Sequence, residues 1–349
     1  MRLSKIRVIL YGVGDIGSAI AKHLLKKQGL EIVGAVDIAR EKVGKDLGEI
    51  LDLNDRIGVV VRKDVESVLS EVEADVAVHS TTSYLKDAYP QVCKLVENHV
   101  NVISTCEELV YPYYTEPELS EKLDALAKKY DVTVLGAGIN PGFLMDTVVI
   151  ALTAVCQVIE RIEVVRAVDP AKRRPSFQKK VGVGLTVDEF KIAGGRITGH
   201  VGLVQSITMI ADALCWNIER IVVDEVKPVV AKEMLESRGV KVKAGRVAGL
   251  RQRAAGLIKG EEVISLDFQA YVGAEEYDAI TIHGVPPVKQ RIQPCIHGDL
   301  GTVGIITNMI PRVLHAPAGL LSMKDLPIPS GTPEDISRCL SPRIRLTSH

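Results

Sequence analysis

A glycine pattern near the start of the chain constrains the fold more than any other feature. The apolar run 6–11 leads directly into the GVGDIG motif of residues 12–17, and the next apolar run ends at Asp37. A strand, this glycine spacing, a helix and an acid about twenty residues later are together typical of a dinucleotide-binding βαβ unit. We therefore predict a strand over 6–11 and a helix over 18–27.

Each glycine of the motif has a physical reason to be there. Gly12 permits a tight turn, Gly14 lets the backbone approach a pyrophosphate, and Gly17 lets the helix pack close to the strand. The start of that helix, with Asp15 and Ile16, can then hold the phosphates at its positive end. Glycines also mark ordinary turns, so the flanking strand, helix and acid carry this assignment.

The acid at the end of the second run bears on which dinucleotide binds. Asp37 should accept hydrogen bonds from the ribose hydroxyls, which favours NAD because a 2′-phosphate would meet a like charge. Arg40 could instead pair with that phosphate, as could Lys42 or Lys45, although Arg40 is equally well explained as a solvated loop charge. The cofactor is therefore expected to be NAD or NADP.

Composition excludes several classes of function. The 43 lysines and arginines balance 44 acids, so no basic surplus attracts nucleic acid or an anionic membrane. The longest apolar stretch, 147–159, is shorter than the roughly 20 residues of a membrane span. No signal peptide is recognisable, and six cysteines without a CxxC pair indicate neither a zinc site nor a disulfide framework. We expect a cytoplasmic protein without a metal.

The first 140 residues alternate Val/Ile-rich runs with amphipathic segments. The expected strands are 6–11, 31–37, 58–61, 75–79, 101–104 and 132–135. Such alternation builds a doubly wound parallel sheet, and ligands bind at the carboxyl ends of its strands. Polar residues do follow the strands, and those expected to touch the cofactor are Ser80, Thr81, Thr82 and Thr105.

The pattern changes after Asn140. A helix over about 143–157 and another over 202–217 are expected among long strands, which we place at 161–169, 191–201, 220–230, 261–273 and 277–284. The predicted fold is α/β: a Rossmann-type domain over 1–140 and an α+β substrate domain over 141–298. Residues 299–349 read as a helix and tail that return to the first domain.

Four further motifs carry a family resemblance. They are STCEELVYP (104–112), GAGINPGFLMD (136–146), GRITGHVGLVQS (195–206) and GDLGTVGIITNMIPRVLHAPAGL (298–320). Together they resemble the 2,4-diaminopentanoate dehydrogenase family, which includes related native amine dehydrogenases and has a nucleotide domain of the dihydrodipicolinate reductase type. The resemblance implies reversible NAD(P)-dependent deamination of 2,4-diaminopentanoate at C4 to 2-amino-4-oxopentanoate and ammonia. It also implies a homodimer, with 141–298 as the substrate and dimerisation domain.

Two adjacent acids suit such chemistry. A protonated amine releases hydride poorly, so a base must first neutralise it and then activate the attacking water. Glu107 and Glu108 follow the strand where the nicotinamide should lie, and partial burial would raise a carboxyl pKa toward the working range. We favour Glu108, since distantly related oxidoreductases place the catalytic residue at the second position of this turn. Alternatively both acids cap the helix near Pro117 or face water.

Three further places could hold the substrate. Asn140, Pro141 and Gly142 form a turn that lines the pocket by resemblance, although Asn140 could simply cap a helix. His200 could bind a substrate carboxylate or the water, although a lone histidine is more often structural. Arg173, in a basic loop, could hold the α-carboxylate, although such a run of charges is more often simply solvated.

Two other functions share the first domain. A dihydrodipicolinate reductase would reduce a cyclic imine, but that family carries an adjacent His-His pair, and no two histidines are adjacent in this chain. A nucleotide sensor could keep the fold without turnover. The intact pair of carboxylates speaks against a sensor.

Overall fold

The computed structural model of the protein describes residues 5–193 and 199–340. The chain divides into two compact units. Residues 1–142 and 299–349 make up the first unit, and residues 143–298 make up the second.

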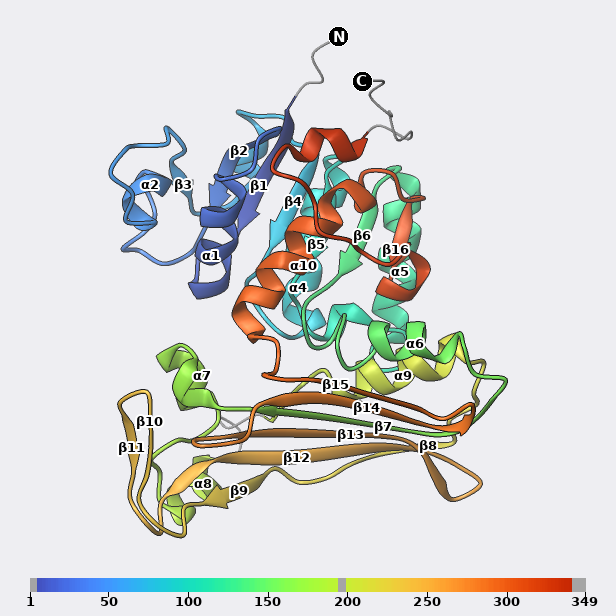
Figure 1. The fold of residues 1–349 in the computed structure, drawn as a ribbon. Coiled ribbons are helices and arrows are strands. Elements are labelled where there is room, and N and C mark those ends of the chain that lie inside the picture. Colours follow the sequence, from blue (N-terminus) through green and yellow to red (C-terminus); the bar gives the residue numbers. More distant parts are fainter. Residues whose placement is uncertain (1–4, 194–198, 341–349) are drawn as a thin grey trace, which may run out of the picture. The chain divides into compact units, whose positions relative to one another are not determined.

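The first unit is built on a parallel seven-stranded sheet with the order β16-β6-β5-β4-β1-β2-β3 (Figure 1). Its strands are β1 (Ile6–Tyr11), β2 (Leu30–Val36), β3 (Val61–Arg62), β4 (Val76–His79), β5 (Asn101–Ser104), β6 (Thr133–Gly136) and β16 (Gly319–Leu321). Strand order reverses around β1, which lies between β2 and β4. In sheets of this kind the crevice beside such a reversal receives the ligand.

Helices cover both faces of this sheet, α1 and α10 on one and α4 and α5 on the other (Figure 1). The helices are α1 (Asp15–Leu24), α2 (Leu47–Ile50), α3 (Val65–Leu69), α4 (Leu85–Glu97), α5 (Pro117–Lys129) and α10 (Gly298–Val313), with short 3-10 turns η1 (Glu108–Val110), η3 (Met323–Asp325) and η4 (Ile336–Leu340). Because the strands are buried on both faces, they read as continuous apolar runs instead of alternating ones. The α/β fold is confirmed.

The second unit holds a mixed sheet with the order β15-β14-β7-β13-β12-β8, in which β9 also pairs with β12. Its strands are β7 (Val158–Val168), β8 (Arg220–Val223), β9 (Lys227–Val230), β12 (Val247–Ile258), β13 (Glu261–Tyr271), β14 (Tyr277–Val285) and β15 (Val288–Ile292), and a separate hairpin joins β10 (Leu235–Ser237) to β11 (Val240–Val242). Its helical elements are α6 (Thr147–Thr153), η2 (Pro170–Lys172), α7 (Pro175–Lys180), α8 (Val187–Ala193) and α9 (Leu203–Ala213). Side chains of α6 and α9 form its core with the inward side chains of β7, β12, β13 and β14.

Several local predictions for this unit were wrong. The expected strand over 191–201 begins inside helix α8, and residues 194–198 lie outside the described part of the chain. The run 220–230 forms two strands instead of one, and α6 ends at Thr153, before the expected limit of the helix. The loop expected around Arg173 contains η2 and α7.

Candidate active site

The sequence-predicted cofactor residues lie along one edge of the parallel sheet. Segments 12–17, 80–82 and 105–108 follow β1, β4 and β5, and Asp37 follows β2. Because carboxyl ends of parallel strands share an edge, these segments are brought together there (Figure 1).

The glycine loop is tight where packing requires it and open where a ligand would approach. Gly12 has a φ of +98°, and a Cβ there would lie 2.4 Å from the Ser80 carbonyl oxygen. A Cβ at Gly17 would lie 2.0 Å from the Gly12 carbonyl oxygen. At Gly14, the N-cap of helix α1, a Cβ would meet no described atom within 4 Å apart from those of its chain neighbours and the helix's own backbone. This arrangement fits a pyrophosphate held at a helix amino end.

Asp37 fastens the glycine loop to the turn after β2. Its Oδ2 accepts hydrogen bonds from the Val13 N–H at 2.9 Å and Lys42 Nζ at 3.2 Å, and its Oδ1 accepts from the Ala39 N–H at 2.9 Å. Burial alone would raise the pKa of Asp37, but these donors lower it below its ordinary value. Arg40 is exposed, whereas Lys42 contacts the carboxylate directly.

The polar run after β4 supports the same loop. Ser80 Oγ donates to the Gly12 carbonyl oxygen at 3.0 Å, and Thr82 Oγ1 accepts from the Tyr84 N–H at 3.3 Å. Thr81 is exposed, with its hydroxyl beside the His79 ring. The Thr105 N–H donates to the His79 carbonyl oxygen at 2.9 Å, which ties the turn after β5 to the turn after β4.

The two acids after β5 have different surroundings. Glu108 Oε2 accepts from the Leu85 N–H at 2.7 Å, so this side chain closes the amino end of helix α4 and not the helix near Pro117. Burial raises the pKa of Glu108 above its ordinary value, opposed by this hydrogen bond. Glu107 is half-buried, and its Oε2 is inaccessible to solvent.

The turn after β6 contains a cis peptide between Asn140 and Pro141 and a Gly142 φ of +117°. Both polar atoms of the Asn140 amide are buried, and no described residue hydrogen-bonds to them. The idea that Asn140 caps the following helix is wrong, because α6 begins at Thr147 and its cap is Asp146. An amide without a partner in this turn is suited to binding a ligand.

Arg173 follows η2 in the second unit. Its guanidinium lies 4.5 Å from the Phe177 ring centroid and packs against Gly298, where a Cβ would stand 2.4 Å from it. Burial lowers the pKa of Arg173 to about 10. The buried Arg166–Asp278 ion pair supports the neighbouring segment, since Arg166 donates to the Ile296 carbonyl oxygen at 2.7 Å.

His200 is held through its backbone. Its N–H donates to Gln252 Oε1 at 2.7 Å, and its ring lies 5.1 Å from the Phe268 ring. At Gly199, the residue before it, a Cβ would lie 1.9 Å from Gln252 Oε1. The space at Gly199 is therefore occupied by a buried glutamine. The sequence contained no spacing that could have identified Gln252.

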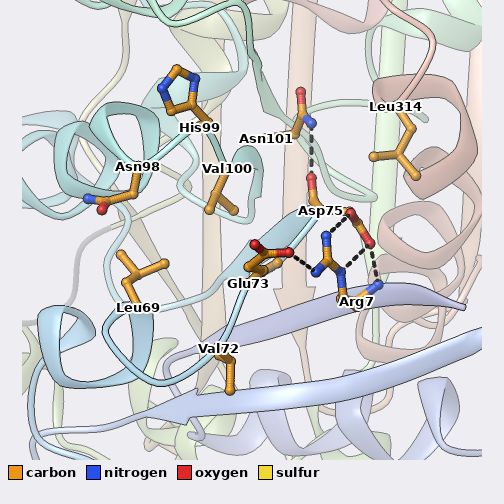
Figure 2. Close-up of a pocket in the computed structure, with 11 residues that line it drawn as sticks. Arg7, Leu69, Val72, Glu73, Asp75, Asn98, His99, Val100, Asn101 and Leu314 are labelled. Carbon is orange, nitrogen blue, oxygen red and sulfur yellow. Dashed lines mark hydrogen bonds and ion pairs between the residues drawn. The ribbon is translucent and has the colours of Figure 1, made fainter. Parts of the chain in front are cut away.

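A cavity of about 450 Å³ lies at the opposite edge of the first sheet, near the amino ends of β1, β4 and β5. Figure 2 shows Arg7 ion-paired with Glu73 and Asp75, at 2.6 and 2.9 Å. Asn101 donates to the Asp75 carbonyl oxygen at 2.9 Å and accepts from the Thr133 N–H. The charged and polar groups of this cavity are already paired with one another. We therefore interpret it as a structural feature that links the ends of these strands, and not as a ligand site.

The described residues show neither a cluster of metal ligands nor a membrane-spanning helix. Between residues 5 and 193 and between 199 and 340, no group of three or more His, Cys, Asp or Glu side chains is arranged to hold a metal ion. Among the helices in those ranges, none has the length and apolarity that crossing a membrane requires.

Comparison with known proteins gives matches over both units. Residues 143–341 match the family model of the 2,4-diaminopentanoate dehydrogenase C-terminal domain, and residues 6–135 match that of the dihydrodipicolinate reductase N-terminus. A 2,4-diaminopentanoate dehydrogenase of Acetoanaerobium sticklandii is 36% identical over 99% of both chains. An amine dehydrogenase of Streptomyces virginiae is 21% identical over 93% of this chain and 96% of its own. The solved amine dehydrogenase of Mycobacterium smegmatis superposes with a TM-score of 0.81 at 29% identity, covering 93% of this chain and 97% of that one.

Proposed function

Because this chain belongs to the 2,4-diaminopentanoate dehydrogenase family, we propose that it deaminates 2,4-diaminopentanoate at C4. It is an NAD(P)-dependent oxidoreductase that acts on CH–NH₂ groups. In the proposed reaction the substrate ammonium, NAD(P)⁺ and water give 2-amino-4-oxopentanoate, ammonium, NAD(P)H and a proton. The reverse direction is reductive amination. The observation that carries the proposal is 36% identity to a dehydrogenase of this name over 99% of both chains.

The proposed chemistry assigns Glu108 the central role. A dinucleotide held by the 12–17 loop and Asp37 would supply the acceptor for the hydride that leaves C4. Glu108 takes a proton from the C4 ammonium, which leaves a lone pair to assist hydride loss, and releases that proton to solvent. It then takes a proton from the water that attacks the iminium and gives it to the departing amine. Its raised pKa suits a group that must both accept and return protons. Glu107, its neighbour, is the alternative base.

The remaining predicted contacts position the substrate. We propose that the buried Asn140 amide, with Pro141 and Gly142, binds the reacting end of the substrate. Arg173 is proposed to bind the α-carboxylate, since a desolvated guanidinium gains much from a paired anion. His200 is proposed to contact the carboxylate or the water. We further propose a cytoplasmic homodimer, for which sedimentation should give twice the 37.9 kDa chain mass.

A spectrophotometric screen tests the proposed reaction. Purified protein is mixed with NAD⁺ or NADP⁺ and with 2,4-diaminopentanoate, other diamino acids or simple amines, and reduction is followed. We expect 2,4-diaminopentanoate to have the highest kcat/KM and the product to be a ketone. Binding of NADH with no turnover in either direction would indicate a sensor.

An imine reductase is the second alternative for the same screen. Reduction of a cyclic imine without amine turnover would identify it. The match to the dihydrodipicolinate reductase family model stops at residue 135, whereas the dehydrogenase model covers residues 143–341, and this difference favours the amine dehydrogenase.

Cofactor preference is predicted to depend on Lys42. Its ammonium offsets the Asp37 charge that would otherwise repel a 2′-phosphate. We expect Lys42→Ala to raise the Kd for NADPH about tenfold or more while changing that for NADH little. Asp37→Ala should do the opposite and weaken NADH more than NADPH. Fluorescence titration with both reduced cofactors measures these constants.

Arg40→Ala is the matched control for the phosphate site. Arg40 is exposed, so its removal should change the ratio of the two constants by less than about twofold. Loss of NADPH binding in Arg40→Ala but not in Lys42→Ala would move the phosphate site to Arg40. An unchanged preference in Asp37→Ala would refute the ribose assignment.

A further inference from the structure

A buried imidazole lies directly beneath the proposed catalytic turn. His79, the last residue of β4, has no solvent exposure, and its ring packs edge-on against Tyr11. Both ring nitrogens have partners: Nδ1 lies 2.8 Å from Ser104 Oγ, and Nε2 lies 2.8 Å from Gln91 Oε1 and 3.0 Å from Thr81 Oγ1. A buried polar ring with polar contacts at both nitrogens can fix the orientation of whatever it touches.

The hydrogen bonds determine which ring nitrogen carries the proton. Gln91 Oε1 is a carbonyl oxygen that can only accept, and it also accepts from Thr81 Oγ1 at 2.8 Å. The proton of the neutral ring is therefore on Nε2, and Nδ1 is an acceptor. Ser104 Oγ must then donate its hydrogen to Nδ1, which leaves the serine oxygen free to accept.

Ser104 connects the His79 ring to the turn that carries Glu107 and Glu108. Its Oγ accepts from the Cys106 N–H at 3.1 Å, immediately before Glu107 and Glu108. Two backbone bonds complete the connection, from the Thr105 N–H to the His79 carbonyl oxygen and from the Glu108 N–H to the Ser83 carbonyl oxygen. The chain from imidazole to Ser104 to the Cys106 N–H thus defines the backbone from which both carboxylates project.

We propose that His79 is a positioning residue, whose Nδ1, through Ser104, fixes the 105–108 turn that carries the base. The proposal rests on the proposed amine dehydrogenase function. Burial lowers the pKa of His79 to about 4, so the ring stays neutral at ordinary assay pH and does not itself exchange protons with substrate. A misplacement of about 1 Å in a catalytic group can reduce rate about a hundredfold, so such a relay has a measurable effect.

Two substitutions of His79 test the hydrogen bonds of its two ring nitrogens one at a time. In His79→Asn the amide oxygen replaces Nδ1 as the acceptor for Ser104, whereas in His79→Gln the amide nitrogen replaces Nε2 as the donor to Gln91. Ser104→Ala removes the hydroxyl that links His79 Nδ1 to the Cys106 N–H and leaves the imidazole in place. We expect kcat to fall about ten- to a hundredfold in His79→Gln and Ser104→Ala, with KM changed by less than about threefold. The loss in His79→Asn should be several times smaller.

A second readout does not depend on turnover. Hydrogen exchange of the peptide spanning 104–110 should be faster than wild type in His79→Gln and Ser104→Ala, and near wild type in His79→Asn. The double variant His79→Gln/Ser104→Ala should lose no more kcat than either single variant, because both changes interrupt one chain. Melting temperature and the Kd for NADH are measured for every variant.

The outcomes separate the two proposals. Equal loss of kcat in His79→Asn and His79→Gln, or unchanged exchange of the 104–110 peptide in Ser104→Ala, would show that the ring only fills space and would overturn this inference. If wild-type protein oxidises no amine, the proposed function fails, and the exchange pattern still decides whether His79 orders the turn. Should the histidine variants not fold, Ser104→Ala alone must reproduce both effects.

Discussion

Replacing Glu108 with glutamine is expected to reduce kcat for amine oxidation by two to four orders of magnitude, about the contribution of a positioned general base. Glutamine keeps an oxygen that can accept from the Leu85 N–H, so the amino end of α4 stays closed and only the charge is lost. The Kd for NADH should therefore remain within about threefold of wild type. Stopped-flow measurement of cofactor reduction isolates the chemical step from product release.

Glu107→Gln is the matched control, since it removes the adjacent charge from the same turn. We expect its kcat to stay within about tenfold of wild type. A large loss in Glu107→Gln with near-normal rate in Glu108→Gln would make Glu107 the base. Near-normal rates in both variants would contradict carboxylate catalysis at this turn.

The pH profile gives a further check on the same residue. A base works only when ionised, and burial raises the pKa of Glu108. The rate of amine oxidation should accordingly fall as pH drops through that raised pKa, at a higher pH than for an exposed glutamate. Glu108→Gln should lose this acidic limb while remaining slow at every pH.

Replacing Arg173 with methionine is expected to raise KM for 2,4-diaminopentanoate about a hundredfold. Removing one partner of a buried, hydrogen-bonded charge pair costs about 2 to 5 kcal/mol of binding free energy. Methionine keeps much of the side-chain packing against Phe177. The decisive comparison uses 2-aminopentane, which lacks the carboxylate. Its kcat/KM, low in wild type, should change by less than about threefold in the variant.

Arg174→Met is the control for a general loss of positive charge. Arg174 precedes α7, and its Nε donates to Ser176 Oγ at 3.0 Å. We expect its KM to stay within about threefold of wild type. An equal loss with both substrates in Arg173→Met would mean that Arg173 supports the fold of its own segment and does not bind the carboxylate.

The strands of the first sheet were predicted well because each can be recognised from its own stretch of sequence. Buried parallel strands are short apolar runs bounded by turns, so β1 and β5 were predicted at their observed limits. The glycine loop was equally readable, since a positive φ at Gly12 and the close packing at Gly17 leave no room for another side chain. The order of the parallel strands in this sheet follows from the right-handed crossover connections between them.

The second sheet was harder because its pairing is nonlocal. Strands β13 and β14 are consecutive in the sequence, but β7 lies between them in the sheet. It runs parallel to β13 and antiparallel to β14 across a sequence separation of about a hundred residues. No turn signal specifies such an insertion, since only the packing of inward side chains selects it.

The site shows the same division between local and nonlocal information. The position of the two acids after β5 was evident, yet the contact that separates Glu108 from Glu107 comes from helix α4. Nothing adjacent to His79 in the sequence reveals its hydrogen bond to Ser104. Partners supplied by distant segments were the part that spacing could not predict.

The sheet of the first unit is completed by the last part of the chain. Strand β16 pairs with β6 from Gly319 onward, and near residue 336 the backbone returns to bond with Gln28. During synthesis on the ribosome, every strand of the intervening unit therefore emerges before the edge of β6 can be covered. The nascent chain carries an open strand edge over that interval, and a product truncated before residue 319 would leave it permanently available for aggregation.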